Sequence, residues 1–339
     1  MPQALDDFIK QQISLNGPMS VATYWNICLA HPQYGYYITR DPLGATGDFT
    51  TAPEISQMFG EMIGVWIADQ WHALDTPSKI YVVECGPGRG TLMSDILRIG
   101  KMIPRFMDAV SVHLVETSPA LRDKQRAVLA DYSVTWHDTI DGIPTDAPVF
   151  IIGNEFLDAL PVQQYVFQDG QCFERVIGVA PDGKLKFGLR QSPFMTASEG
   201  IENGSIYEVS PARENFISDI SARIVSQSGA ALMIDYGHDV SGYGDTFQAV
   251  KNHTYVDVLG DCGHADLTSH VDFGRLKNIS IAQGLQVGLQ GQGDFLKRMG
   301  IEHRAAQLMQ KSDKISADLH RLVDDDAMGQ LFRVMEIVK

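Results

Sequence analysis

An amide and two carboxyl groups follow an apolar run in the middle of the chain. Residues 148–153 are continuously apolar, which is typical of a strand buried on both faces, and Asn154, Glu155 and Asp158 come directly after it. Ligands of open α/β sheets bind at the carboxyl ends of the strands. The cluster therefore predicts a catalytic site that holds a metal ion, acts as a general base or binds a cation. The alternative is a helix start whose acids favour the helix dipole.

A glycine-rich turn precedes this cluster. Residues 81–83 are apolar and β-prone, Glu84 follows them, and an apolar, helix-compatible run begins at residue 91. Strand, glycine turn and helix together are typical of the nucleotide-binding start of a doubly wound sheet. The spacing is G-x-G-x-G, which differs from the dinucleotide pattern G-x-G-x-x-G, and Glu84 stands where S-adenosylmethionine (SAM) methyltransferases carry an acid. A simple tight turn is the alternative.

Two further acids end the next two predicted strands. Glu116 ends residues 111–116, near the offset at which an acid binds ribose hydroxyls. Asp138 ends residues 134–138, where an adenine amino group could be recognised. The alternatives are a solvated strand end and a turn-forming Asp.

The segment ahead of the glycine turn predicts a lid. Thr51 and Glu54 match a capping box, and Pro53 lies in the first turn of the helix they would start. Free N–H groups at that start could bind a carboxylate of the cofactor, although capping alone would explain both residues. We therefore assign these residues to cofactor binding: Glu84, Gly86, Pro87, Gly88, Gly90, Glu116, Asp138 and Thr51.

Composition and charge limit the classes of partner. The 339 residues are 44% hydrophobic and 20% charged, as in ordinary globular proteins. A net charge of −15 disfavours a nucleic-acid partner and is compatible with a basic protein or cationic substrate. No apolar run approaches the length of a membrane span. The four cysteines are far apart, which indicates reduced thiols and no metal site.

The remaining pattern predicts where the chain is interrupted by insertions. Residues 162–188 alternate around Asp-Gly turns, as in a β-meander, and residues 242–263 are loop-rich and polar. We expect an N-terminal helical region with the cofactor lid over residues 1–78. A methyltransferase-type domain would cover residues 79–339, with insertions at about 162–209 and 242–270. The first twenty residues lack an apolar targeting segment, so we expect a cytoplasmic protein.

Five motifs give the chain a resemblance to a known family along nearly its whole length. They are GDFTTAPEIS at 47–56, ECGPGRGTL at 84–92, NEFLDALP at 154–161, DYGH at 235–238 and DLTSHVDF at 266–273. The chain resembles the MidA-like SAM-dependent methyltransferases, which include the mitochondrial complex I assembly methyltransferase. One departure is the segment before His253, where the family tends to carry a basic, aromatic run and this chain has FQAVKN.

The resemblance implies an α/β, Rossmann-like SAM methyltransferase sheet of seven mostly parallel strands. It also implies methylation of an arginine in a protein substrate, which in the mitochondrial relative is a core subunit of complex I. Asn154, Glu155 and Asp158 would then be catalytic, with the two acids holding the guanidinium. We assign substrate binding to Glu208, Tyr236 and His238.

Three other functions remain open on the sequence. A metal-dependent small-molecule methyltransferase would use Asp138, Asn154 and Asp158 as oxygen ligands for Mg²⁺. A non-catalytic assembly chaperone could keep a SAM-type fold without turnover. A Rossmann oxidoreductase would need the dinucleotide spacing and a second nucleotide-binding half, and neither is clear.

Overall fold

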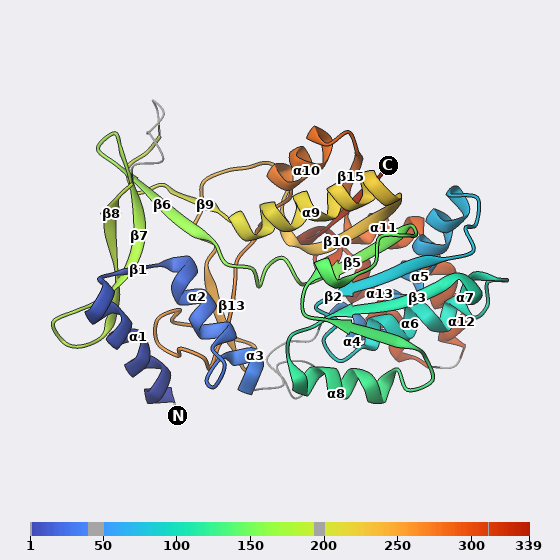
Figure 1. Cartoon of the computed structure of the whole chain (residues 1–339), viewed down its shortest axis with the longest axis horizontal. Helices are drawn as coiled ribbons and strands as arrows, with labels where there is room; N and C mark the ends of the chain where they lie inside the picture. The colour runs from blue at the N-terminus through green and yellow to red at the C-terminus, as the bar shows by residue number, and fades with distance from the viewer. Residues whose placement is uncertain (1, 40–50, 193–200, 311) are drawn as a thin grey trace.

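The computed structural model describes residues 2–39, 51–192, 201–310 and 312–339, and Figure 1 shows them as two lobes joined by extended segments. The larger lobe is built on a mixed sheet, and the smaller one contains the N-terminal helices. The predicted motif residues 47–50 lie outside the described part of the chain.

The central sheet has eight strands in the order β15-β16-β10-β5-β2-β3-β4, with β14 paired to β10. Strands β10, β5, β2, β3 and β4 run parallel, whereas β16 is antiparallel to both of its neighbours. The α/β class is confirmed, and the sheet is mixed. The strands are β2 (Ile80–Cys85), β3 (Val110–Val115), β4 (Val134–His137), β5 (Val149–Asn154), β10 (Gly229–His238), β14 (Val271–Asp272), β15 (Gln286–Gly291) and β16 (Phe332–Val338).

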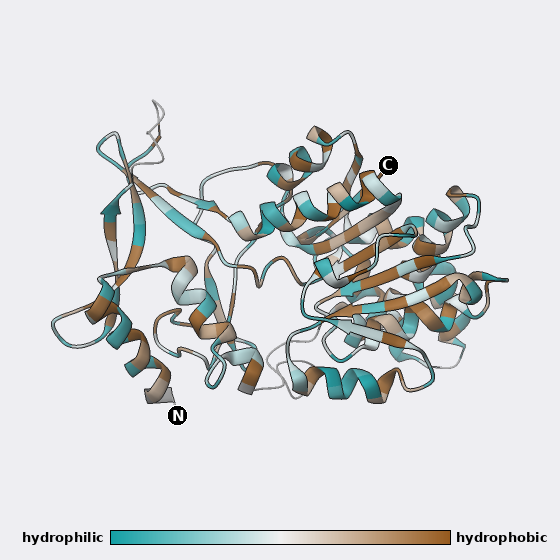
Figure 2. Cartoon of the chain, viewed as in Figure 1, coloured by the Kyte–Doolittle hydropathy of each residue, from teal (hydrophilic) through white to brown (hydrophobic). Residues whose placement is uncertain are grey.

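Helices cover both faces of this sheet because its inner strands are apolar on both sides. Every residue of β2 and β5 is buried, and Figure 2 shows the hydrophobic colour concentrated on these strands. One core contains α5, α6, α7, α11, α12 and α13, and the opposite core contains α9 and α10. The helices of this lobe are α4 (Ala52–Ile55), α5 (Gln57–Ala73), α6 (Thr91–Gly100), α7 (Phe106–Ala109), α8 (Pro119–Val128), α9 (Pro211–Gln227), α10 (Phe273–Ala282), α11 (Gln292–Arg298), α12 (Ile301–Met309), α13 (Lys314–Val323) and α14 (Met328–Leu331).

The smaller lobe joins three segments that are distant in the sequence. A separate core packs residues 5–36 against residues 162–177 and 247–267. The meander predicted over residues 162–188 corresponds to β6, β7 and β8, while β9 pairs with β6 and β1 pairs with β7. The elements are α1 (Pro2–Asn16), β1 (Met19–Ser20), α2 (Val21–Ala30), α3 (Tyr36–Thr39), β6 (Gln163–Gln168), β7 (Gln171–Val179), β8 (Leu185–Gln191), β9 (Ile206–Val209), β11 (Gln248–Lys251), β12 (Thr254–Val256) and β13 (Asp266–Thr268).

The N-terminal region is thus divided between the two lobes. Helices α1 and α2 belong to the core of the smaller lobe, whereas α4 and α5 pack into the core of the larger one. The boundary near residue 78 stays a prediction. Across the described ranges, no helix is both long and apolar enough to cross a membrane.

Candidate active site

The glycine turn connects β2 to α6 in a conformation that requires its glycines. Gly86, Gly88 and Gly90 have φ values of 66°, 52° and 85°, a region that side chains with a Cβ disfavour. A pocket of about 410 Å³ opens at this turn, and a second of about 970 Å³ adjoins it, since Gly86 lines both. Pro87 and Gly88 line the first pocket together with Asn154 and Glu155.

Glu84 lies at the floor of the first pocket with an unused acceptor atom. Its side chain is buried, with 3% exposed, and its Oε2 has no hydrogen-bond partner. Burial raises the pKa of Glu84 to about 8, the backbone N–H of Met93 opposes the rise, and the nearby Glu116 adds to it. A buried, unpartnered carboxyl at a glycine turn fits the ammonium group of an amino-acid-like ligand.

Glu116 and Asp138 line the second pocket. Glu116 Oε1 accepts a hydrogen bond from the N–H of Ser118 (2.8 Å), and Oε2 accepts one from Gln125 Nε2 (3.3 Å). Burial raises the pKa of Glu116. Asp138 is exposed and pairs with Arg122 at 2.6 Å. The two acids therefore face the same pocket, with Glu116 held in a fixed orientation.

The polar cluster after β5 lies beside the first pocket, with Asn154 and Asp158 buried and Glu155 half-buried. Glu155 adopts a left-handed backbone conformation, with a φ of 48°, which a non-glycine residue keeps only when its surroundings impose it. Glu155 Oε1 accepts hydrogen bonds from the N–H of Ala52 and from Asn154 Nδ2, both at 3.2 Å. Asp158 Oδ2 accepts one from the hydroxyl of Tyr236 at 2.8 Å. The structure thus brings Asn154, Glu155, Asp158 and Tyr236 together.

This cluster contains more acceptors than donors. Asn154 Oδ1 and Asp158 Oδ1 are buried without a partner. Burial raises the pKa of Glu155 to about 7, with a further contribution from the neighbouring Asp158. Burial also raises the pKa of Asp158, while the Tyr236 hydrogen bond lowers it. Unpartnered acceptors beside raised-pKa carboxyls fit a ligand that donates several hydrogen bonds and carries positive charge.

Asp235 and Arg213 were not predicted as site residues, and they hold the loop after β5 (residues 155–160, here called the acceptor loop) in place. Asp235 Oδ2 accepts hydrogen bonds from the N–H groups of Leu157 and Asp158, each at 3.0 Å. Arg213 is 3% exposed and donates to the carbonyl oxygens of Leu157, Asp158, Leu160, Ser269 and His270. Asp235 could have been found as an acid at the end of an apolar strand, but Arg213 stands in an ordinary amphipathic helix with no such signal.

The other predicted substrate residues lie around a third pocket of about 840 Å³, lined by Glu208 and His238. Glu208 Oε1 accepts from Gln164 Nε2 (2.7 Å) and from the N–H of Thr246 (3.0 Å), so its carboxylate is already hydrogen-bonded within the protein. Tyr236 is separated from this pocket by His270, whose ring packs edge-on against it with centroids 5.6 Å apart.

Thr51, Pro53 and Glu54 also line the first pocket, next to the glycine turn. Thr51 makes no side-chain capping hydrogen bond, and the helix it precedes ends after four residues. The N–H of Ala52 binds Glu155, so this donor is already used inside the protein. Glu54 accepts a hydrogen bond from the Thr91 hydroxyl at 2.7 Å, which ties the segment to α6.

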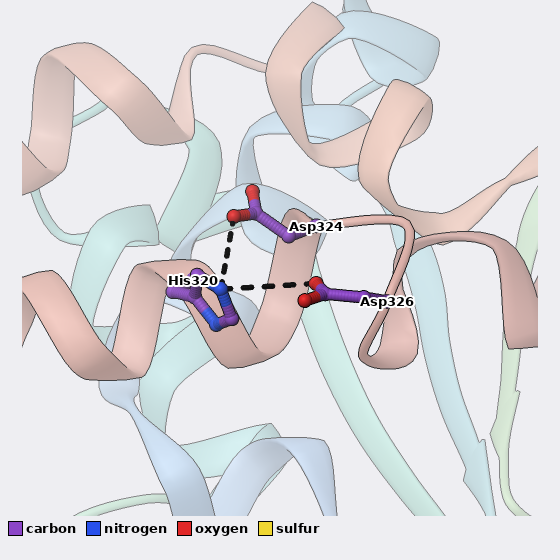
Figure 3. Close-up of side chains that lie close together, drawn as sticks. All are labelled: His320, Asp324 and Asp326. Atoms are coloured by element: carbon purple, nitrogen blue, oxygen red, sulfur yellow. Dashed lines mark ion pairs between the residues drawn. The ribbon is translucent and has the colours of Figure 1, made fainter.

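Figure 3 shows the one group of described residues whose geometry could suit a metal ion: His320, Asp324 and Asp326. His320 Nε2 lies 3.3 Å from Asp324 and 3.7 Å from Asp326, distances that an ion pair of a protonated imidazole also gives. The alternative Mg²⁺ set fits poorly. Asp138 follows β4, three strands from β5, which places it roughly 14 Å from Asn154 and Asp158.

The fold and sequence match known methyltransferases. Residues 62–289 match the profile of a family described as "Putative S-adenosyl-L-methionine-dependent methyltransferase". The chain is 35% identical to the zebrafish (Danio rerio) mitochondrial protein arginine methyltransferase NDUFAF7, over 97% of this chain and 86% of that protein. It is 37% identical to the Caenorhabditis elegans homologue, over 90% and 78%. The similarity therefore extends over both lobes.

A crystal structure from Burkholderia thailandensis, with S-adenosylhomocysteine bound, superposes with a TM-score of 0.87 at 24% identity. The superposition covers 100% of this chain and 92% of that one, which confirms the fold. The expected cytoplasmic localisation is contradicted, because the matching protein arginine methyltransferases are named as mitochondrial. The absence of a recognisable targeting segment was an insufficient basis for that prediction.

The glycine turn with its buried acid, the adjoining second pocket and these matches agree on one cofactor, SAM, and on one class of reaction. The chain belongs to this family of S-adenosyl-L-methionine-dependent methyltransferases.

Proposed function

We propose that this chain transfers a methyl group from SAM to the side chain of an arginine in a protein. The observation that carries the proposal is a pair of neighbouring carboxyls, the half-buried Glu155, which lines the pocket at the glycine turn, and the buried Asp158. The relatives named as protein arginine methyltransferases support the same acceptor.

The cofactor residues are part of the proposal. Glu84 would bind the ammonium group of SAM through its unpartnered Oε2, and Glu116 would bind the ribose hydroxyls from the second pocket. Asp138 would border the adenine end of that pocket, Gly86, Pro87, Gly88 and Thr51 would line the methionine end, and Gly90 would maintain the turn. SAM supplies a methyl group on a sulfonium, which needs only a nucleophile placed in line with it.

The acceptor residues must convert a poor nucleophile into a reactive one. A guanidinium is charged at neutral pH, and its delocalised charge makes each nitrogen weakly nucleophilic. Carboxylates of Glu155 and Asp158 would accept its N–H bonds on one side and hold the positive charge there. Another nitrogen then stays free to form the new N–C bond as the methyl–sulfur bond breaks. The guanidinium must lose one proton as this bond forms, and Glu155, whose pKa burial raises to about 7, would take it from an N–H that it already contacts.

The charge balance around the acceptor loop favours a cation. Asp158 and Asp235 are buried there and Glu155 is half-buried, whereas Arg213 is a buried cation that contacts the loop. A guanidinium would offset the surplus of acids and would supply donors to the unpartnered oxygens. A neutral small molecule could donate hydrogen bonds to these oxygens but would not offset the surplus of acids.

The smaller lobe and the third pocket would receive the protein around the target arginine. Glu208 and His238 line that pocket, and Tyr236 lies between it and Asp158. The seven longer strands would form the methyltransferase sheet, with the two-residue β14 as an addition. A core subunit of respiratory complex I is the first target to test, as the family resemblance implies.

Incubation with radiolabelled SAM and a mitochondrial lysate, followed by mass spectrometry of the labelled protein, tests the proposal. Methylarginine in one protein is the expected result, and EDTA should leave transfer unchanged. Label only on small molecules, or transfer abolished by EDTA and restored by Mg²⁺, would favour the metal-dependent alternative instead.

A further inference from the structure

Gln125 is a fully buried amide directly under the glycine turn. It lies on α8, and its side chain is 0% exposed. Its Nε2 donates to the carbonyl oxygen of Gly88 at 2.8 Å and to Glu116 Oε2 at 3.3 Å. One side chain therefore joins the turn that lines the first pocket to the acid that lines the second.

The orientation of this amide is fixed by a third hydrogen bond. Trp136 Nε1, on β4, donates to Gln125 Oε1 at 2.8 Å. An indole N–H can only donate, so the amide oxygen must face Trp136 and both amide hydrogens must face the cofactor site. The contact with the turn is also close, because a Cβ at Gly90 would lie 3.5 Å from Gln125 Cα and Cγ.

We propose that Gln125 is a positioning residue for the cofactor: it sets the distance between the Glu116 carboxylate and the Gly88 peptide, and so between the two ends of the SAM site. The proposal rests on the assignment of Glu116 to the ribose. It goes further by giving a role to a residue of α8 that lines neither the first nor the second pocket.

The hydrogen-bond pattern specifies glutamine at this position. A glutamate would place a carboxylate against two acceptors, the Gly88 carbonyl and Glu116. A methionine keeps the length and volume but removes both donors and the acceptor for Trp136. In this variant Glu116 keeps the hydrogen bond from the N–H of Ser118 but loses the one from Gln125 Nε2. The carboxylate of Glu116 therefore loses its fixed orientation.

Calorimetric titration of S-adenosylhomocysteine into Gln125→Met tests the proposal. We expect binding roughly tenfold weaker than wild type, the effect of losing a hydrogen bond to a charged group, with the transfer rate at saturating SAM within about twofold. Gln292→Met is the matched control, because Gln292 is equally buried, donates to the Leu322 carbonyl, and lines neither the first nor the second pocket. Its affinity should be unchanged.

A double variant separates positioning from general stability. If Gln125 acts through Glu116, Glu116→Gln combined with Gln125→Met should bind more tightly than the product of the two single losses predicts. The proposal is overturned if the affinity loss of the double variant equals the product of the two single losses. It is also overturned if Gln125→Met folds and binds S-adenosylhomocysteine with wild-type affinity. If that variant does not fold, Trp136→Phe replaces it, and unchanged affinity there overturns the proposal equally. Unchanged affinity in Glu116→Gln refutes instead the ribose assignment.

Discussion

Cofactor binding should release a proton from Glu84. This carboxyl is buried with one unpartnered oxygen, and its pKa of about 8 keeps it about 90% protonated at pH 7 in the free protein. An ammonium group placed against it would favour the charged form. Binding of S-adenosylhomocysteine at pH 7 should therefore release about 0.9 proton, and affinity should rise about ninefold from pH 6 to pH 7.

The same pKa makes a prediction for stability. The folded state keeps Glu84 protonated above the usual pKa of 4.5, whereas the unfolded chain loses this proton there. The contribution of Glu84 to the free energy of unfolding is therefore fully present below pH 4.5 and is lost as pH rises through about 8. At about 1.36 kcal/mol per pH unit, the loss reaches at most about 5 kcal/mol. Glu84→Gln cannot ionise, so the free variant should be more stable than wild type at pH 8 and should differ little at pH 4.

Calorimetry in buffers of different ionisation enthalpy measures the released proton. Glu84→Gln should reduce the release to the small contribution of other groups and should flatten the pH dependence of affinity. Glu302→Gln, an exposed acid on α12, is the control and should behave as wild type. Equal binding enthalpies in all buffers for the wild type, or the same proton release in Glu84→Gln, would refute the reasoning.

Three further predictions follow from the contacts of other residues. Arg213→Lys should slow methyl transfer at least tenfold, because one ammonium cannot bind five carbonyls. Affinity for S-adenosylhomocysteine should stay within about threefold of wild type. An unchanged rate would show that Arg213 does not position the acceptor loop for transfer. Hydrogen exchange over residues 52–56 should slow when S-adenosylhomocysteine binds, because this segment lines the first pocket. Slowing confined to residues 84–92 would show that the segment is structural and does not act as a lid over the cofactor. Burial and the neighbouring His137 lower the pKa of His113 to about 4, so the unfolded state binds the proton first as pH falls below about 6.5. The free energy of unfolding should therefore fall by about 2 kcal/mol more in wild type than in His113→Gln between pH 7 and pH 5, as measured by urea titration.

The α/β sheet could be predicted, and candidate site residues could be proposed, because both depend on local patterns. Apolar runs ending in Glu84, Asn154 and Asp235 mark strands, and the strand-end rule then places polar residues at one edge. The glycine spacing was informative because each glycine has a positive φ that the turn requires. The family resemblance contributed the arginine, which no spacing of acids specifies.

Features set by contacts between distant segments could not be predicted. Residues 248–256 were expected to be a loop but form the hairpin β11–β12, whose turn uses Asn252 and His253 at φ values of 51° and 60° in place of the usual glycine. The capping box at Thr51 matched a pattern, yet the Ala52 N–H binds Glu155, which is 103 positions away. The left-handed backbone of Glu155 itself has no signal in the sequence.

The guanidinium clamp is the central claim, and a single-turnover assay tests it directly. Enzyme saturated with SAM is mixed with an arginine-containing target protein, and methyl transfer is followed in wild type, Glu155→Gln and Asp158→Asn. Each amide keeps the shape of the side chain but removes the charge that holds the guanidinium. We expect methyl transfer to slow by roughly 100-fold or more, with SAM affinity within a few fold, because the charge acts at the transition state. Glu174→Gln, on β7 and away from the site, is the control. Transfer at the wild-type rate in both Glu155→Gln and Asp158→Asn would contradict the guanidinium clamp. It would mean that the two acids only stabilise the acceptor loop.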